Sequence, residues 1–233
     1  MQPDNGQPTA ITPQAKSKLP IIIVVIAVFV AVAGVAVAIL VTRDSTDSDG
    51  GDKNGTSKTD DGKSGDGDEG KDKPSKNEDY KAEKHGFSIA FESAPRIEDV
   101  SQPAGNGLDM EAVQYLDLSA SGNEGYMVQV SKYTRSNGAM IKAAEFNDRT
   151  GLDGAIGAMS SSGGIKLISS TNKGTFMGKY SSADAELEAE GKVVYVKAFV
   201  KHDDTVYAYV IMSIGKSRAE FEAFIESFKF IES

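Results

Sequence analysis

A continuous apolar stretch near the N-terminus constrains this chain more than any other feature. Residues 19–41 read LPIIIVVIAVFVAVAGVAVAILV and contain no charged or hydrogen-bonding side chain. As an α-helix, the segment from Pro20 to Val41 rises roughly 33 Å, which matches a hydrocarbon core of about 30 Å. Pro20 lies in the first turn, where its missing N–H costs no hydrogen bond. We therefore predict a transmembrane helix over residues 19–42, which contacts the lipid bilayer and makes this a single-pass membrane protein.

The charges beside this segment predict its orientation. Lys16, Lys18 and the amino terminus precede it, whereas Arg43 is followed by a run of aspartates. Positive charge is retained on the cytoplasmic side of a membrane. We expect residues 1–18 to form a cytoplasmic tail and everything after the helix to lie outside the cell membrane.

A cleaved signal peptide is the competing interpretation of the same stretch. Ala31-Val32-Ala33 and Ala36-Val37-Ala38 both have the small-x-small pattern that a signal peptidase accepts. Both sites lie inside the apolar run rather than after it, and the run is longer than the usual apolar core of a signal. We favour the uncleaved anchor, and either interpretation places the rest of the chain outside the cytoplasm.

The segment after the apolar run, residues 43–79, contains no hydrophobic residue. It has 12 acidic residues, 7 basic residues and 7 glycines. A segment with nothing to bury cannot offset the entropy cost of ordering. Its acidic runs do not match a calcium-binding loop, because Gly51 and Gly70 occupy positions where such a loop needs an oxygen ligand. We predict a disordered linker with a root-mean-square reach of roughly 30–37 Å.

Composition excludes several classes of function. The chain has no cysteine, which excludes a disulfide framework, a thiolate metal site, a cysteine nucleophile and a lipid-modified lipoprotein. The formal net charge is −9, so the chain offers little to neutralise the phosphates of a nucleic acid. We predict no nucleic-acid partner.

Hydrophobic residues return at Tyr80, and residues 80–233 are long enough for one folded domain. Alternating and helical hydrophobic periods predict strands and helices in this region. The expected strands cover residues 87–91, 96–102, 110–118, 125–133, 183–190, 192–201 and 205–214, and the expected helices cover residues 139–146, 152–159 and a C-terminal segment from 217. We predict an α+β fold, with a largely antiparallel sheet of about six or more strands flanked by helices.

Two elements of this domain carry the strongest patterns. A three-residue loop at 202–204 would place Val200 opposite Val206 and Ala198 opposite Ala208, which makes both faces of the sheet substantially apolar. At the C-terminus, Ser217 and Glu220 form a capping-box pattern. Phe221, Phe224, Ile225 and Phe228 follow it at helical spacing, and we interpret them as core residues that cover the sheet.

The domain resembles the PsbP-like superfamily. The resemblance covers roughly residues 80–233 and rests on the opening GFSIAFES-AP, the segment GTFMGKYSSADAELE, the hairpin KVVYVKAFVKHDDTVYAYVIMS and the closing FEAFIESFKF. Family members usually continue the opening with Pro-Gly-x-Pro, where this chain has Glu92-Ser93-Ala94-Pro95. The resemblance implies a PsbP-like α+β domain of a membrane-tethered bacterial protein. These motifs are packing patterns, and they imply no catalytic residue.

Few residues in the chain suggest chemistry. His85 and His202 are the only histidines, and a metal site would require them to converge with carboxylates. The loop Ser160–Gly164 suits a helix-to-strand connection better than a nucleophile site. The ladder Asp184, Glu186, Glu188 and Glu190 places carboxylates about 7 Å apart on one strand face, where a pairing of Asp184 with Lys197 favours a plain ion-paired surface. We predict no catalytic residue, no cofactor-binding residue and no metal ligand.

These observations predict a non-catalytic domain that binds a protein, a peptide or another component of the cell envelope and is displayed on a tether. A hydrolase or metal-dependent enzyme that acts on envelope material is the alternative, and a sensor or accessory subunit of a membrane complex is a further one. A concave pocket that gathers a histidine with two or more buried carboxylates would favour the enzyme. The sequence predicts no oligomeric state.

Overall fold

The computed structural model describes residues 79–105, 107–161 and 164–231. These residues form two antiparallel sheets, which account for most of the secondary structure, and two α-helices. In chain order the elements are β1 (Tyr80–Ala82), η1 (Glu83–His85), β2 (Phe87–Ile89), β3 (Arg96–Asp99), β4 (Gln102–Gly105), β5 (Leu108–Leu118), β6 (Gly125–Arg135), η2 (Ala143–Glu145), α2 (Asp148–Ser161), β7 (Ile165–Phe176), β8 (Tyr180–Ala189), β9 (Lys192–His202), β10 (Val206–Ile214), α3 (Arg218–Glu226) and β11 (Lys229–Phe230).

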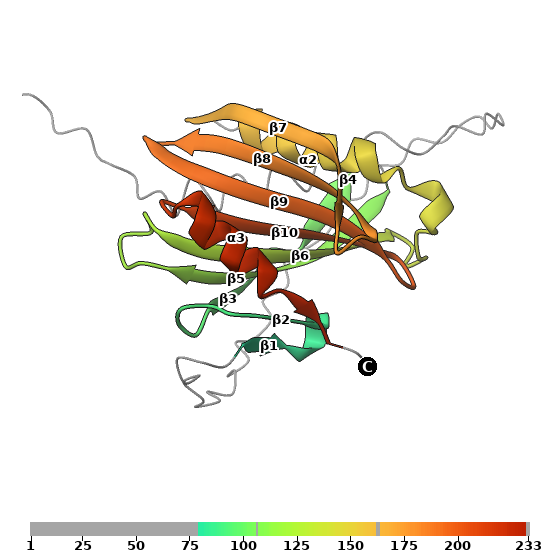
Figure 1. The fold of residues 1–233 in the computed structure, drawn as a ribbon. Helices are drawn as coiled ribbons and strands as arrows, with labels where there is room; N and C mark the ends of the chain where they lie inside the picture. The colour runs from blue at the N-terminus through green and yellow to red at the C-terminus, as the bar shows by residue number, and fades with distance from the viewer. Residues whose placement is uncertain (1–78, 106, 162–163, 232–233) are drawn as a thin grey trace, which may run out of the picture.

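The larger sheet has eight strands in the order β3-β5-β6-β10-β9-β8-β7, and β4 also pairs with β5. The smaller sheet has the order β1-β2-β11, which joins the two ends of the domain. In Figure 1, α3 lies in front of the larger sheet and α2 lies behind it, while β7 forms the upper edge. The larger sheet is therefore the central layer, and each face is covered by other elements.

The predicted α+β class is wrong, because the described part of the chain is mostly β. Residues 139–146 do not form the predicted helix: Met140 pairs with Thr134 in an isolated bridge, and only Ala143–Glu145 makes a short 3-10 turn. The backbone N–H of Ile141 donates to Thr205 Oγ1, which holds this segment against the sheet. Ile165–Phe176, where no strand was predicted, forms the 12-residue strand β7. Strand pairing with β8 thus decides a conformation that the local sequence does not indicate.

The β9–β10 hairpin forms as predicted, but its register differs by two residues. His202 pairs with Val206 and Val200 pairs with Ala208, so the loop consists of residues 203–205. The N–H of Asp203 donates to the carbonyl of Thr205 inside this loop. A shift of two residues preserves which face each side chain occupies, because side chains alternate with a period of two. The prediction of two apolar faces is therefore confirmed, although the individual pairs are not.

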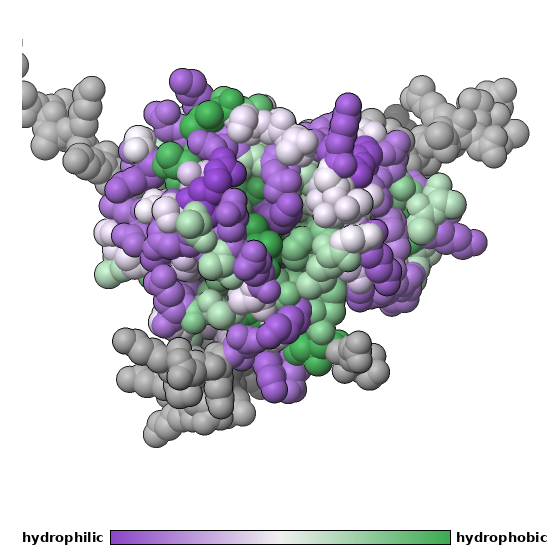
Figure 2. All heavy atoms as spheres, in the orientation of Figure 1, coloured by the Kyte–Doolittle hydropathy of each residue, from purple (hydrophilic) through white to green (hydrophobic). Residues whose placement is uncertain are grey.

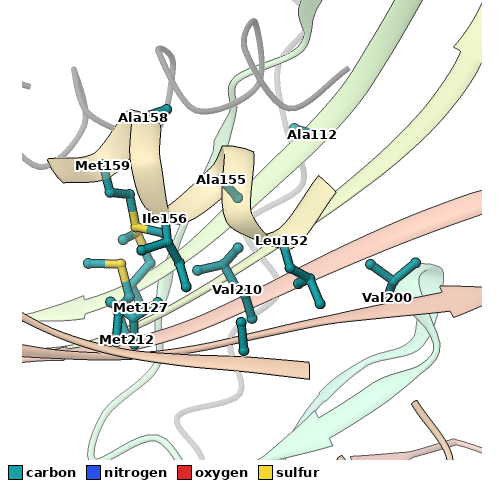
Figure 3. Close-up of a cluster of buried hydrophobic side chains, with 14 of the residues drawn as sticks. Ala112, Met127, Leu152, Ala155, Ile156, Ala158, Met159, Val200, Val210 and Met212 are labelled. Carbon is teal, nitrogen blue, oxygen red and sulfur yellow. The ribbon is translucent and has the colours of Figure 1, made fainter. Parts of the chain in front are cut away.

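One face of the larger sheet packs against α2. In Figure 3, Leu152, Ile156 and Met159 point from α2 toward the strands, where Met127, Val210 and Met212 meet them. The predicted helix 152–159 lies within α2, and its apolar stripe forms the core of this layer. Gly151 lies where a Cβ atom would be only 2.7 Å from the Phe146 ring, so the close approach of that ring requires glycine.

The opposite face packs against α3 and the smaller sheet. The side chain of Ser217 accepts from the N–H of Glu220, and the Glu220 carboxylate accepts from the N–H of Ser217, so the predicted capping box is confirmed. Phe221, Phe224 and Phe228 are buried, as predicted for core residues. Phe228 is 1% exposed, and its ring centroid lies 5.4 Å from that of Phe87 and 5.5 Å from that of Phe199. This aromatic cluster joins the smaller sheet to the larger one.

The predicted cytoplasmic tail 1–18, the predicted transmembrane helix 19–42 and residues 43–78 of the predicted linker lie outside the described residues. Within the described ranges, neither α2 nor any other helix has the length and apolar character needed to cross a membrane.

Candidate functional site

A cleft of about 520 Å³ opens on the face of the larger sheet that carries α3. Val113 of β5 and Val130 of β6 are directly opposite each other and form its apolar floor. The remaining lining residues are polar, and they are Lys84, His85, Asp99, Ser101, Glu111, Lys132 and Tyr207. We call this feature the His85 cleft.

Strand pairing explains why residues so distant in sequence meet in the His85 cleft. Glu111 pairs with Lys132, and Lys132 pairs with Tyr207, so these three side chains form one row across β5, β6 and β10. Asp99 pairs with Val113 and extends the neighbouring row. Paired residues point to the same face of a sheet. The cleft thus has carboxylates toward the β3 side and cations over its centre and rim.

His85 is held at the edge of the cleft by two tyrosines. Its Nδ1 shares a hydrogen bond with the Tyr115 hydroxyl, and its carbonyl accepts from the Tyr209 hydroxyl at 3.4 Å. Burial, and then the charge of Lys84, lower the pKa of His85. Burial raises the pKa of Tyr115, which keeps that hydroxyl protonated. His85 is therefore a neutral side chain at physiological pH and is fixed in position, and within the described part of the chain no carboxylate pairs with it.

The charged side chains of the His85 cleft are available to a ligand. Asp99 and Glu111 are exposed, and among the described residues neither Lys84 nor Lys132 forms an ion pair within 4 Å. Burial, followed by the charge of Asp204, raises the pKa of Tyr207 to about 12, so its hydroxyl stays protonated and donates to Asp204 at 3.2 Å. The cleft presents charges of both signs above an apolar floor, which suits recognition of a polar group.

The second histidine, His202, lies on the other face of the sheet. It follows Lys201, which pairs with Tyr207 of the cleft row, so alternation directs it away from the cleft. Its Nε2 is 2.7 Å from Asp148 Oδ1 at the start of α2, and its ring contacts Phe146 edge to face. The two histidines do not converge, and within the described ranges no group of three or more His, Asp and Glu side chains is arranged to hold a metal ion.

Four other residues singled out in the sequence, Asp184, Glu186, Ser160 and Ser161, have structural partners. Asp184 forms an ion pair with Lys197 at 2.6 Å, as predicted, and Glu186 pairs with Arg218 of α3. The hydroxyls of Ser160 and Ser161 both donate to the carbonyl of Gly157 at the end of α2, while residues 162–163 lie outside the described residues. None of these side chains lines the His85 cleft.

Sequence reasoning identified His85 but missed the residues that surround it. Lys84, Glu111, Lys132 and Tyr207 belong to four different elements, and no local motif connects them. The strand pattern assigns Glu111 and Lys132 to strands, yet only the pairing of β5 with β6 places them opposite each other. Comparison with known proteins gives no match, either to a family model or to a curated protein. The resemblance to the PsbP-like superfamily therefore stays a prediction.

Proposed function

We propose that this protein is a single-pass membrane protein whose C-terminal domain is a non-catalytic binding module displayed outside the cell on a flexible tether. The observation that carries this proposal is the composition of the His85 cleft, in which accessible charges of both signs surround an apolar floor. Such a lining can hold a polar group through hydrogen bonds and ion pairs. The partner is a protein, a peptide or another component of the cell envelope.

The arrangement around His85 supports binding over catalysis. A general acid or base needs a pKa near the working pH and a second group that orients it. Tyr115 orients His85 through Nδ1, but burial and the charge of Lys84 lower the pKa of His85, and the two carboxylates of the cleft are exposed rather than buried. The cleft therefore lacks the buried carboxylates that would favour the alternative of an envelope hydrolase.

Capture from envelope extracts tests the binding module. The full-length protein is immobilised beside two variants, Lys132→Met in the cleft and Lys192→Met at the exposed start of β9, which lies outside the cleft. We expect the same partner to be retained by the parent protein and by Lys192→Met and to be lost with Lys132→Met. Equal retention by all three proteins would refute the assignment of the cleft.

Protease treatment of intact cells tests the proposed topology. We expect added protease to remove the C-terminal domain from intact cells and to leave a short fragment that contains the apolar run 19–41. Digestion only after lysis would contradict the proposed location outside the membrane.

A further inference from the structure

The strand β7 forms one open edge of the larger sheet. It has 12 residues, and among the described residues it pairs only with β8, so its other side presents backbone N–H and C=O groups without a strand partner. The opposite edge differs, because β3 has only four residues and shares β5 with β4. An edge as long as β7 is a template for pairing with another strand.

The side chains of β7 favour such pairing. Between Lys166 and Lys173 the stretch Leu167–Asn172 carries no charge. Leu167 is 39% exposed and Ile168 is 47% exposed, although both are large apolar residues. Figure 2 shows hydrophobic atoms at the upper margin of the molecule, where β7 runs. Of the features that usually keep an edge single, β7 has flanking lysines and two register shifts against β8, between Leu167 and Ser169 and between Thr171 and Gly174, but this stretch has no proline and no inward charge.

The helix beside this edge leaves room for a second molecule. Arg149 of α2 donates to the carbonyls of Asn172 and Gly174 on β7 and of Ser182 on β8, which places the Arg149 stripe of the helix over these two strands. At helical spacing the same stripe continues through Asp153, Gly157 and Ser160, all of which have short side chains. A Cβ atom at Gly157 would have nothing within 4 Å.

We propose that two copies of this chain associate through β7, which pairs antiparallel with β7 of the second copy around a two-fold axis perpendicular to the sheet. Such an axis makes one residue face its own copy. If that residue is Ser170, Lys166 lies opposite Gly174 and Lys173 lies opposite Leu167. If it is Ser169, Lys166 lies opposite Asn172 and Lys173 lies opposite Ile165. No lysine faces a lysine in either register. The uncharged centres of two β7 strands can therefore pair without placing like charges directly opposite each other.

The same symmetry brings the two α2 helices together. Each α2 packs over β7 and β8, and neighbouring strands are about 4.8 Å apart. Across the two-fold axis the helices would therefore lie roughly 10 Å apart, which is a normal distance for packed helices. Strand pairing and helix packing then stabilise one continuous interface. This inference does not depend on the His85 cleft or on the proposed tether.

Disulfide trapping tests the pairing directly, because the full-length chain contains no cysteine. Ser169→Cys and Ser170→Cys each place one thiol at a candidate axis, where facing Cα atoms about 4.5–5.5 Å apart meet the geometry of a disulfide. The control is Ser136→Cys in an exposed turn away from β7. We expect mild oxidation to give a covalent dimer with at least one of the two β7 variants and none with the control. Equal crosslinking of all three variants, or crosslinking of none, would overturn the proposal.

Two matched isoleucines test the interface without a crosslink. In the two registers Ile168 lies opposite Asn172 or Ser170 of the second copy, so Ile168→Lys places two positive charges diagonally across the axis. Ile97→Lys changes a similarly exposed residue, 54% exposed against 47% for Ile168, on the opposite edge. We expect sedimentation of the full-length protein to show a dimer that Ile168→Lys weakens about tenfold and Ile97→Lys leaves unchanged. Three outcomes would refute association through β7. They are a parent protein that is monomeric, a dimer that Ile168→Lys does not weaken, and a β7 that pairs only with a different protein.

Discussion

Replacement of Phe228 by alanine tests whether the aromatic cluster holds the two sheets together. Phe228 follows α3 and is 1% exposed, with the rings of Phe87, Phe199 and Phe230 within 5.5 Å between centroids. Removal of a buried phenylalanine side chain costs about 3–5 kcal/mol through lost burial and the cavity that remains. The rings around Phe228 belong to both sheets and cannot all move into the space, so we expect a loss near the upper end of that range.

Urea denaturation of the full-length protein, followed by far-UV circular dichroism in constant detergent, measures this loss. The matched control is Phe230→Ala, because Phe230 is a neighbouring aromatic residue that is only half-buried. We expect the control to lose less than half as much free energy of unfolding as Phe228→Ala, since less apolar area leaves water at that position. If the two variants lose the same free energy, or if Phe228→Ala loses less than about 1 kcal/mol, the cluster does not join the sheets as described.

Three further predictions follow from local features. Ser217→Ala removes the capping box of α3 and should lower the free energy of unfolding by about 1 kcal/mol, which thermal or urea denaturation would detect; no change would mean that the cap is replaceable. The lowered pKa of His85 means that this side chain binds a proton more readily in the unfolded chain than in the folded one, so the free energy of unfolding should fall as the pH falls below about 6.5. His85→Gln should reduce the change in the unfolding midpoint between pH 7 and pH 5.5. Gly157→Ala in the exposed part of α2 should stabilise the protein by about 0.5–1 kcal/mol, and a loss of stability would show that the site is crowded.

Most strands of the folded domain could be predicted from their hydrophobic period. The alternation from Ala183 to Glu190 and the turn at Gly191 locate β8 and the start of β9, and Glu190 and Gly191 indeed adopt left-handed backbone angles there. The stripe after Ser217 likewise predicts α3 and the burial of its phenylalanines, but the predicted helix is too long, because α3 ends at Glu226 and Lys229–Phe230 forms β11. These elements succeed because each carries its pattern within one short segment.

Other elements had no local pattern to predict them. β7 reads IKLISSTNKGTF, in which apolar and polar residues do not alternate, and its conformation depends on pairing with β8 across two irregularities. Residues 139–146 have helical spacing over too few positions to outweigh their contacts with β6 and Thr205. The overestimate of helix and the omission of β7 together produced the wrong fold class.

The sequence by itself determined the features that depend on composition and local pattern: an apolar run long enough to span a bilayer, a segment at 43–79 with no hydrophobic residue, the absence of cysteine, and the capped helix that covers the sheet. The tertiary structure alone decided which distant residues meet. Only the pairing of β5, β6 and β10 places Glu111, Lys132 and Tyr207 in one row, and only the strand order leaves β7 with a single neighbour among the strands that the structure describes. The physical reason is that periodicity acts along the chain, whereas register and edge position arise between segments that have no sequence relation to each other.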